Sequence, residues 1–593
     1  TSAITSSFNQ DISTKEVTIG AGRSIETTYN AWDVSSVNRW GPNNTNSETY
    51  PPGREGTFYN NKSFNQDISN WQIATGSGDV WMQGMFRGAS AFDQPLNTNT
   101  VEVGSKIYEA WNTKKVITLR NTFYGATNFN QPLNDWNTNA VTTYFYTFYS
   151  ANKFNQPLNK WETTPSTNMN GMFQNTNMTY DLSSSYQPAT SGRSEYIAWD
   201  TSNVTNMFKM FHNGVNTTSP YQGYNGNIYN WNTSNVANIG GMFSGTGTQT
   251  SSFNQNINTK EVTIGAETSI GTTYNAWDVS SVTFFGRDLT NTGFSGYYQE
   301  SLFYNNPHFN QPLGNWQINT GSGLNLSLRG MFQGASSFNQ DISSSIVTVG
   351  SKTYRAWDTS RVSMTMFMFD AARNFNKPIG NWDMTNNKYT AYMFRNADVF
   401  NQDISASIQT VGSDTYNAWY TPDNTSMFQM FNSADNFSKP IQNWEIGNVT
   451  NFSNTFSTTG LINQSFATQS VSLNGGVSYK SWDIGSKFLT STTGSNMNDM
   501  FNNSNDFGGV GLGTWNVSKV YTFGDTFANL TNISTETYDE ILISWSSSLN
   551  SGNFTVTQIS FGNAKYTGGS TAAGAHEFIE DNLGITLTDG GTV

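Results

Sequence analysis

The sequence predicts a repeat solenoid: a parallel β-solenoid of about fifteen coils with short strands and helical or 3-10 turns, ending in a small α/β C-terminal cap. Three observations predict this fold. The phrase FNQPLNDW (129–136) recurs in near copies along the 593-residue chain. The shortest copies are spaced by 25 residues, a period typical of solenoids. Aromatic residues make up 15% of the chain and charged residues only 12%, so a stacked aromatic core is expected rather than disorder.

Tryptophan marks each repeat. Alignment on this residue gives fifteen repeats, whose tryptophans are Trp32, Trp71, Trp111, Trp136, Trp161, Trp199, Trp231, Trp277, Trp316, Trp357, Trp382, Trp419, Trp444, Trp482 and Trp515. A phenylalanine, often in a Met-Phe pair, follows twelve residues later in most repeats. Because a single repeat can bury these rings only against its neighbours, they are the expected structural core. Representative members are Trp136, Phe148, Trp199, Phe211, Trp382, Phe394, Trp419 and Phe431.

A longer duplication overlies the short repeat. Residues 6–37 recur as 251–282 with 27 of 32 positions identical. The predicted domains are therefore a repeat solenoid over 1–537, with duplicated blocks at about 6–250 and 251–500, and a cap over 538–593. Two segments of the cap, TYDEILISWSSSL and AAGAHEFIEDNL, are the strongest helix candidates. At the other end, the first FNQ begins at Phe8, so an open sheet edge is expected. Either another molecule covers that edge, head to tail, or the chain is a piece of something longer.

Each part of the repeat suggests a local structure. The alternating segment after tryptophan, such as TSNVTNM (201–207), predicts a short strand that stacks into a parallel sheet. Inserts within 338–357 and 400–419 alternate Val, Thr and Tyr and predict small β-excursions. The Asn of FNQ is expected to form a ladder that satisfies backbone groups of the turns.

The residue after FNQ or FDQ indicates what the repeat is for. It is Pro at 95, 132, 157 and 312 and Asp at 11, 67, 341 and 403. Both residues suit the first position of a turn, whereas a catalytic carboxylate could not be exchanged for proline. The repeated residues are therefore interpreted as architecture rather than as a series of sites.

The pattern FNQPLNxWxTSxVTxMxxMFxxA, best represented by WDTSNVTNMFKMFHNG (199–214), resembles the repeats of BspA-like leucine-rich-repeat bacterial surface proteins. The resemblance covers roughly residues 6–530, and the tail resembles the closing segment of such proteins. It implies a leucine-rich-repeat-like solenoid displayed outside the cell and used for adhesion or partner binding. Leucine is scarce here, and the twelve-residue inserts are not part of the plain repeat, so the chain departs from the family pattern in these two respects.

Composition excludes several kinds of partner and site. The formal charge is −13 with scattered Lys and Arg, which disfavours nucleic acid, and no segment is apolar enough for direct membrane insertion. The absence of cysteine removes disulfides and thiolate chemistry. His212, His308 and His576 lie far apart in the repeat frame, so no His-based metal site is predicted. No catalytic residue and no cofactor is predicted, and bound calcium is left open.

The two longest inserts, 39–61 and 284–306, are the predicted functional surface, because they diverge while the scaffold around them does not. Their candidate partner-binding residues are Trp40, Tyr50, Tyr59, Phe285, Tyr297 and Tyr298. These rings could stack on sugars or fill pockets of a partner. The competing interpretation is that they pack their own loops onto the scaffold.

These observations favour a non-enzymatic extracellular or cell-surface protein, an adhesive or structural repeat scaffold. Its expected partners are a second copy, which would give head-to-tail filaments, another surface protein, or glycans on a host cell. The alternative is a viral or phage fibre for host attachment, located on the virion surface. A carbohydrate-active enzyme is disfavoured, because such enzymes cluster acids and bases in one groove and this repeat does not.

Overall fold

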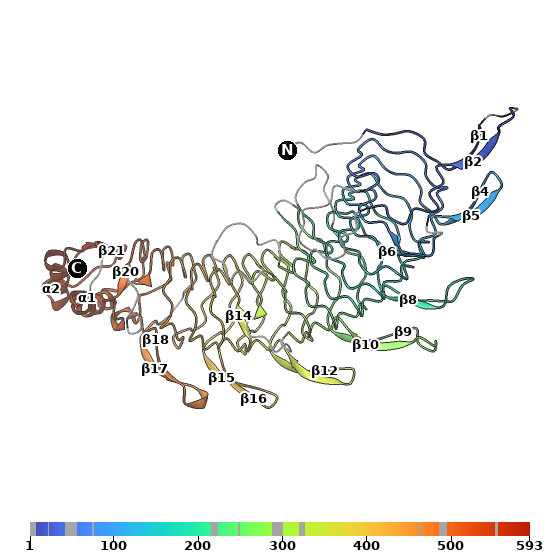
Figure 1. The fold of residues 1–593 in the computed structure, drawn as a ribbon. Coiled ribbons are helices and arrows are strands. Elements are labelled where there is room, and N and C mark those ends of the chain that lie inside the picture. Colours follow the sequence, from blue (N-terminus) through green and yellow to red (C-terminus); the bar gives the residue numbers. More distant parts are fainter. Residues whose placement is uncertain are drawn as a thin grey trace. The chain divides into compact units, whose positions relative to one another are not determined.

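The computed structural model describes residues 7–19, 21, 23–41, 56–73, 76–214, 223–246, 249–286, 301–318, 326–461, 464–485, 495–551 and 556–593. The chain divides into two compact units, Thr1–Val282 and Thr283–Val593. Each unit is a succession of repeats with short paired strands, and the α-helices of the described residues lie near the C-terminus (Figure 1). Every sheet in the described part of the chain has two strands. The prediction of a repeat protein is thus confirmed.

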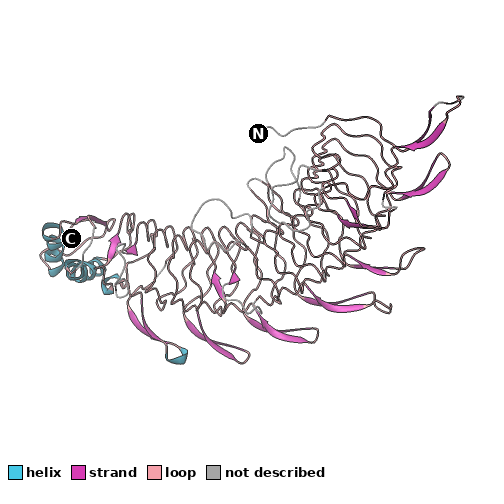
Figure 2. Cartoon of the chain, in the orientation of Figure 1, coloured by secondary structure: helices cyan, strands magenta, loops and turns pink. Residues whose placement is uncertain are grey.

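Antiparallel hairpins are the main regular structure. In the first unit they are β1–β2 (Lys15–Ile19, Thr27–Ala31), β4–β5 (Asn99–Val103, Lys106–Ala110), β7–β8 (Ser185–Gln187, Tyr196–Ala198) and β9–β10 (Lys260–Ile264, Thr272–Ala276). In the second unit they are β12–β13 (Ser345–Val349, Lys352–Ala356), β15–β16 (Ser407–Val411, Asp414–Ala418) and β17–β18 (Gln469–Ser472, Ser478–Ser481). Within each unit the hairpins project from the stacked repeats (Figure 2). The β-excursions predicted at 338–357 and 400–419 are confirmed as β12–β13 and β15–β16.

Parallel pairing between repeats is much shorter than predicted. It comprises β3 with β6 (Val80–Trp81, Val116–Thr118), β11 with β14 (Leu326–Ser327, Val362–Met364), β19 with β20 (Ser495–Asn496, Val520–Thr522) and β21 with β22 (Gln558–Ser560, Thr586–Thr588). Elsewhere in the described residues, single bridges such as Thr143 to Asn168 link successive repeats. The described residues therefore do not form the continuous parallel sheet expected from segments such as 201–207.

A regular sequence of turns replaces that sheet. The Phe86 N–H donates to the Thr122 carbonyl of the next repeat at 2.9 Å, whereas the following N–H, of Arg87, donates to Gly84 O at 3.1 Å within its own repeat. Gly84 and Gly88 have φ values of 65° and 71°. A strand cannot contain left-handed residues at every fourth position, because L-residues in strands have negative φ. The repeats are nevertheless joined by backbone hydrogen bonds, which satisfies the buried peptide groups.

The core is a stack of aromatic rings. The eight representative core residues, Trp136, Phe148, Trp199, Phe211, Trp382, Phe394, Trp419 and Phe431, are at most 3% exposed. In the first unit the rings of Trp136 and Trp161 lie 6.5 Å apart and are nearly parallel, at 2°. The indole Nε1 of Trp161 donates to the carbonyl of Leu133 in the preceding repeat at 2.9 Å. The same indole–carbonyl hydrogen bond recurs in most later repeats, as from Trp199 to Leu158 and from Trp382 to Ile342, so these tryptophans satisfy their single polar atom while burying a large apolar surface.

The predicted asparagine ladder is present. Asn130 Oδ1 accepts the backbone N–H of Asn155 at 2.8 Å and the side-chain amide of Gln156 at 3.2 Å, both in the next repeat. The Asn130 N–H itself donates to Asp93 Oδ1 of the repeat before. Asp93 takes the same place as an asparagine because the position requires an oxygen acceptor and not the amide NH₂.

Substitutions at Asn130 test this ladder. We expect Asn130→Ala to lower the free energy of unfolding by about 1–3 kcal/mol, because two donors of the next repeat lose their acceptor. Asn130→Asp should cost under about 1 kcal/mol, since it reproduces the residue already found at Asp93. Urea denaturation of the full chain measures both changes. Equal losses in the two variants would show that the oxygen acceptor is not what matters.

The aspartates that alternate with proline act as turn residues, as predicted. Asp341 Oδ1 accepts the Ser343 N–H and Asp403 Oδ1 accepts the Ser405 N–H, each at 2.9 Å. Each carboxylate accepts a hydrogen bond from the residue two positions later and so stabilises a turn. Proline stabilises the turn in other repeats by fixing its own φ.

Two α-helices lie near the C-terminus, where helices are predicted. The helix α1 (Thr535–Asn550) begins after Ser534, whose hydroxyl accepts the Thr537 N–H, and α2 (Thr571–Glu577) begins after Ser570 in the same manner. Short helical turns are η2 (Asn474–Gly476), η3 (Leu512–Thr514) and η4 (Phe578–Asn582). Trp545 of α1 donates its indole N–H to Leu512 O at 2.9 Å, so the helix continues the indole–carbonyl pattern of the repeats. Among the described residues, no helix has the length and apolar character needed to span a bilayer.

Candidate functional site

The six predicted partner-binding residues fall into three groups: two lie in the core, three lie outside the described residues, and one is half-buried. Trp40 is 5% exposed and its ring stacks on Trp71 at 5.4 Å. Phe285 is 1% exposed and lies 6.2 Å from Trp316. These two rings belong to the core, because each insert begins by continuing the aromatic stack, and they are therefore not available to a partner. Tyr50, Tyr297 and Tyr298 lie outside the described residues. Tyr59 is half-buried, with the Arg87 guanidinium 5.7 Å from its ring centre.

The hairpins offer a surface that the sequence argument did not single out. Each of six hairpins is fixed at its base by a tyrosine whose hydroxyl donates to a backbone carbonyl of the preceding repeat, one residue before that repeat's tryptophan. The pairs are Tyr108 with Asn70, Tyr196 with Lys160, Tyr274 with Asn230, Tyr354 with Asn315, Tyr416 with Asn381 and Tyr479 with Asn443. We call this contact the tyrosine latch. It holds an inserted hairpin at a fixed place on the scaffold.

The tryptophan that ends each hairpin is also specialised. In all seven hairpins this residue has a left-handed backbone with φ between 46° and 54°, at Trp32, Trp111, Trp199, Trp277, Trp357, Trp419 and Trp482. This conformation costs about 1–2 kcal/mol for a bulky residue. Burial of the ring and the backbone hydrogen bond to the previous tryptophan, as from Trp419 to Trp382 at 3.1 Å, offset that cost. The returning strand is thereby connected to the core.

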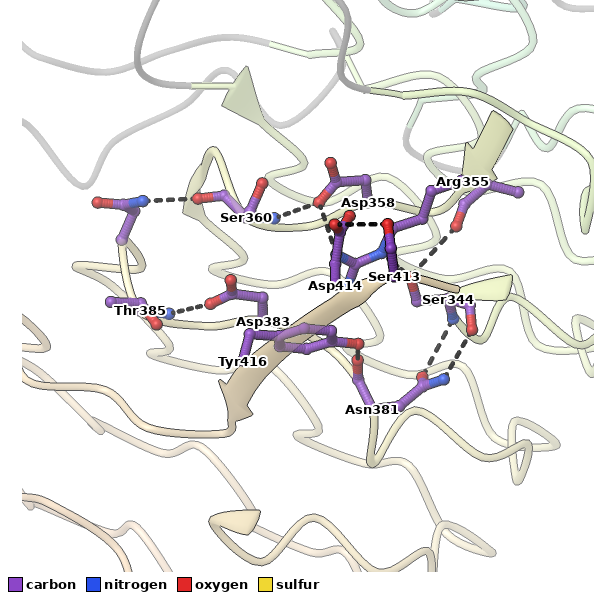
Figure 3. A network of polar contacts seen from close by, with 12 residues as sticks. Ser344, Arg355, Asp358, Ser360, Asn381, Asp383, Thr385, Ser413, Asp414 and Tyr416 are labelled. Carbon is purple, nitrogen blue, oxygen red and sulfur yellow. Dashed lines mark hydrogen bonds and ion pairs between the residues drawn. The ribbon is translucent and has the colours of Figure 1, made fainter. Parts of the chain in front are cut away.

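A polar network surrounds the latch of β15–β16 (Figure 3). Asn381 exchanges two hydrogen bonds with the backbone of Ser344, and Tyr416 donates to the Asn381 carbonyl. Arg355 of β13 donates from Nε to Ser344 Oγ at 2.7 Å and lies 4.2 Å from the centre of the Tyr416 ring. Arg355 also forms an ion pair with Asp358, with 3.7 Å between Nη1 and Oδ1. The guanidinium therefore joins two successive hairpins.

Beside this network lies an open cleft of about 460 Å³ in the second unit. Its lining consists of hydroxyl, amide and turn residues from three repeats: Ser343, Pro378, Gly380, Asn381, Gln402, Asp403, Ser405, Ser407 and Gln409. Ser407 and Gln409 belong to strand β15, so the hairpin forms one wall of the cleft. A surface of this kind suits hydroxyl-rich ligands, which exchange hydrogen bonds with amides and hydroxyls.

The cleft lacks the groups that acid–base catalysis needs. Asp403 is the single titratable residue in its lining, and its Oδ1 already accepts the Ser405 N–H. A glycosidase-type mechanism requires two carboxyl groups across the bond that is cleaved. Among the described residues, no cluster of three or more His, Asp or Glu side chains is arranged to hold a metal ion.

Two of the three histidines, His212 and His576, are buried and contact neighbouring side chains. His212 is 3% exposed, and its Nδ1 lies 2.6 Å from Ser244 Oγ. Burial lowers the pKa of His212 to about 3, so this side chain is neutral at physiological pH. His576 contacts Asp589 at 3.1 Å and stacks on Tyr566. His212 and His576 belong to different units, and His308 is exposed in the second unit.

The tyrosine latch predicts a specific response to alkaline pH. Burial raises the pKa of Tyr274 to about 12, above its ordinary value of about 10. Between these values the unfolded chain loses the phenol proton while the folded chain retains it, so stability falls as pH rises from about 10 to 12. We expect Tyr274→Phe to cost about 1 kcal/mol at pH 8 and to make the alkaline decline shallower by an amount on the order of 2 kcal/mol. Urea denaturation at a series of pH values measures this effect.

Tyr29→Phe is the matched control for the latch. Tyr29 holds the equivalent position in the first hairpin and is 45% exposed. Its substitution should leave both the stability at pH 8 and the alkaline decline unchanged within about 0.5 kcal/mol. If Tyr29→Phe alters them as much as Tyr274→Phe does, the latch contact is not the cause.

Sequence reasoning missed the latch although a pattern for it exists. A tyrosine stands three residues before the tryptophan of every hairpin, as in TYNAW, TYRAW and SYKSW. The spacing alone does not reveal that the hydroxyl reaches a backbone carbonyl about 40 residues earlier, because inserts of variable length separate the two positions.

Comparison with known proteins gives one family. The sequence model described as Mycoplasma protein of unknown function, DUF285, matches residues 20–107, 99–190, 175–268, 275–407, 408–481 and 479–552. No curated protein and no solved structure matches the chain. The six matches follow one another along most of the sequence, as the repeats and hairpins do. The chain therefore belongs to the family of Mycoplasma proteins of unknown function, DUF285.

Proposed function

We propose that the protein is a non-enzymatic extracellular surface protein that acts as an adhesive repeat scaffold. In this proposal its repeats form a leucine-rich-repeat-like parallel solenoid of the BspA-like kind, and its hairpins present the contact surface. The tyrosine latch is the observation that carries the proposal. A contact repeated in six hairpins serves to hold inserted segments in place on a scaffold, and no acid–base pair accompanies it in the cleft.

The outer residues of the hairpins support a role in contact. Ile19, Ile107, Ile346 and Ile408 lie on four hairpins and are 58%, 70%, 48% and 52% exposed. Water-exposed isoleucines on these hairpins contribute little to the fold, and covering them with a partner would be energetically favourable. The adjacent cleft adds hydroxyl and amide groups. Together these features suit a surface that binds another macromolecule.

Self-association is a second form of the proposal. In the first described repeat Phe8, Tyr29 and Trp32 are 42%, 45% and 53% exposed, although the equivalent rings of later repeats are covered. A repeat from a second copy would cover them. Light scattering over a range of concentrations tests this form, and a mass that stays that of the monomer at every concentration would reject it.

Replacing one hairpin tests the adhesive role. Residues 403–418 are exchanged for Pro-Leu-Asn-Lys, the native connection at 157–160 of a repeat without an insert. We expect a folded protein with an unchanged aromatic near-UV spectrum and a reduced attachment of protein-coated beads to cultured animal cells. The same exchange is then made in the hairpin at 341–356. Full attachment by the variant that lacks both hairpins would refute the adhesive role of this surface.

A further inference from the structure

A second surface, formed by the turns on either side of the Met-Phe or Thr-Phe pairs of the first unit, carries tyrosine and arginine side chains from successive repeats. We define the tyrosine–arginine patch as Tyr59, Arg87, Arg120, Tyr124, Tyr146 and Tyr149. All six side chains are half-buried, so each has one side in contact with the protein and another open to solvent. Neither the hairpins nor the polar cleft uses these residues.

The rings and guanidiniums of the patch are in contact with one another. Tyr124 stacks on Tyr149 with ring centres 4.5 Å apart, and Tyr146 meets Tyr149 edge-on at 5.0 Å. The Arg87 guanidinium lies 4.5 Å from the Tyr124 ring centre and 5.7 Å from that of Tyr59. These contacts hold planar groups in fixed positions across several repeats and reduce the entropy that a ligand would have to remove.

The patch is basic in an acidic protein. Its turn segments, 56–64, 82–92, 119–129 and 144–154, contain Lys62, Arg87, Arg120 and Lys153 and no Asp or Glu, although the whole chain has a formal charge of −13. Burial lowers the pKa of Arg87, with the neighbouring Arg120 contributing in the same direction. The positive charge of these segments favours an anionic ligand over a cationic one.

The duplicated block shows that the scaffold does not require this charge. In the second unit the corresponding segments contain Asp370 and Asp398, which pair with Arg395 and Arg373 at 2.7 Å. Two of the three arginines in these second-unit segments, Arg373 and Arg395, are therefore paired with aspartates, and the third is Arg329. The aromatic core beneath is the same in both units, so the difference is confined to the surface.

Tyr146 has a backbone conformation that folding alone does not favour. Its φ is 53°, at a position occupied by Gly84 and Gly171 in other repeats of the first unit and by Phe367 and Tyr392, also at positive φ, in the second unit. A bulky residue at positive φ costs about 1–2 kcal/mol. The ring lies over Gly171, where a Cβ atom would approach the Tyr146 ring to 2.2 Å. The glycine thus leaves space for the Tyr146 ring over the next repeat.

We propose that the tyrosine–arginine patch binds a linear anionic polysaccharide, one that carries sulfate or uronate groups. Tyrosine faces suit the apolar faces of pyranose rings, and guanidiniums form paired hydrogen bonds with sulfate or carboxylate oxygens. A linear polymer fits because the patch extends through successive repeats, whose core rings Phe86, Phe123 and Phe148 are spaced by 5.4 Å. Nucleic acid is disfavoured by its phosphate density against a net charge of −13.

This inference deepens the proposed function by naming a ligand class for the scaffold, and it is tested separately from the hairpins. The full chain is titrated with fluorescein-labelled chondroitin sulfate, hyaluronan and neutral dextran, with affinity measured by anisotropy at two salt concentrations. We expect binding to one or both anionic polymers that weakens with salt, and no binding to dextran. Hyaluronan carries carboxylates alone, so comparison with chondroitin sulfate separates the two anions.

Three variants locate the site. Arg87→Gln combined with Arg120→Gln should weaken binding at least tenfold, whereas Lys106→Gln combined with Lys114→Gln, which removes equal charge at exposed positions outside the patch, should change it less than threefold. Tyr146→Gly should weaken binding while the midpoint of urea denaturation stays the same or rises, because the strain is removed.

Equal losses in the two charge variants, binding of dextran, or tighter binding of a single-stranded oligonucleotide that displaces the polysaccharide would each overturn the proposal. Absence of binding to both anionic polymers would do so as well. If the patch fails in this way but hairpin replacement still abolishes cell attachment, the adhesive function stands without the patch.

Discussion

Trp382→Ala is expected to lower the free energy of unfolding of the second unit by about 4–8 kcal/mol. The Trp382 side chain is fully buried, and its ring lies parallel to that of Trp357 at 6.1 Å. Its Nε1 donates to Ile342 O at 3.0 Å. Truncation leaves a cavity, which costs about 3–5 kcal/mol for a large aromatic residue, and a buried carbonyl without its donor, which costs about 1–3 kcal/mol. Urea denaturation with hydrogen-exchange mapping measures the loss and its location.

Trp32→Ala is the internal control for this substitution. Trp32 holds the tryptophan position of the first hairpin-bearing repeat, but its side chain is 53% exposed. Its truncation in dilute protein should cost under about 1 kcal/mol. A third variant, Trp382→Phe, keeps a ring and removes the indole donor, so its cost separates packing from hydrogen bonding. A loss at Trp32 equal to that at Trp382 would mean that stacking between repeats is not the source of stability.

Much of the scaffold is predictable because its rules are local and repeated. A tryptophan every 25 residues in the shortest repeats must pack against the equivalent part of the next repeat. The ladder follows the same spacing, because Asn130 accepts the N–H of Asn155, 25 residues later. The turn role of Asp403 follows from its exchange with proline in other repeats. In each case the residue type restricts the contact to one kind, so the sequence alone indicates the partner.

The path of the backbone between these anchors was not predictable in the same way. Alternating polar and apolar residues after tryptophan predict a strand. The series of turns found in the structure also buries alternate side chains, so it produces the same sequence pattern. The difference lies in φ at residues such as Gly84 and Asn121, where glycine or asparagine permits a left-handed conformation. Tyrosine at the equivalent position 146 conceals this preference, because its backbone is held there by the neighbouring repeats.

The candidate binding surfaces were also only partly predictable from the sequence. Trp40 and Tyr59 lie in one insert and were predicted together, yet the first is a core ring and the second belongs to the tyrosine–arginine patch. Whether an insert side chain is buried depends on which residues of the neighbouring repeat lie next to it. Because the inserts vary in length, the sequence does not show which residues those are. Arg87 and Tyr124 are 37 residues apart in sequence and in contact through the fold. Such a column of side chains becomes visible only when the repeats are stacked.

Removing one complete repeat should leave the rest of the first unit folded. Deletion of residues 137–161 takes out 25 residues, from the one after Trp136 through Trp161. Asn130 then occupies the position of Asn155, which accepts the Thr179 N–H, and Phe123 occupies that of Phe148, which stacks on Phe173 at 5.6 Å. Because repeat proteins gain stability from nearest-neighbour contacts, we expect a cooperative transition with a melting temperature lowered by under about 5 °C.

Deletion of residues 137–149 provides the contrast. It removes half a repeat, including Phe148, and leaves Phe154 and Trp161 out of register with Phe129 and Trp136. Every ring and every ladder amide after the deletion would then face the wrong group of the repeat before, so the near-UV circular dichroism of the first unit should be lost. Thermal melts of both deletions, followed in the near-UV, decide the matter. If the two deletions are tolerated equally, the repeats are not held in register by their stacked side chains, and the 25-residue period has no structural meaning.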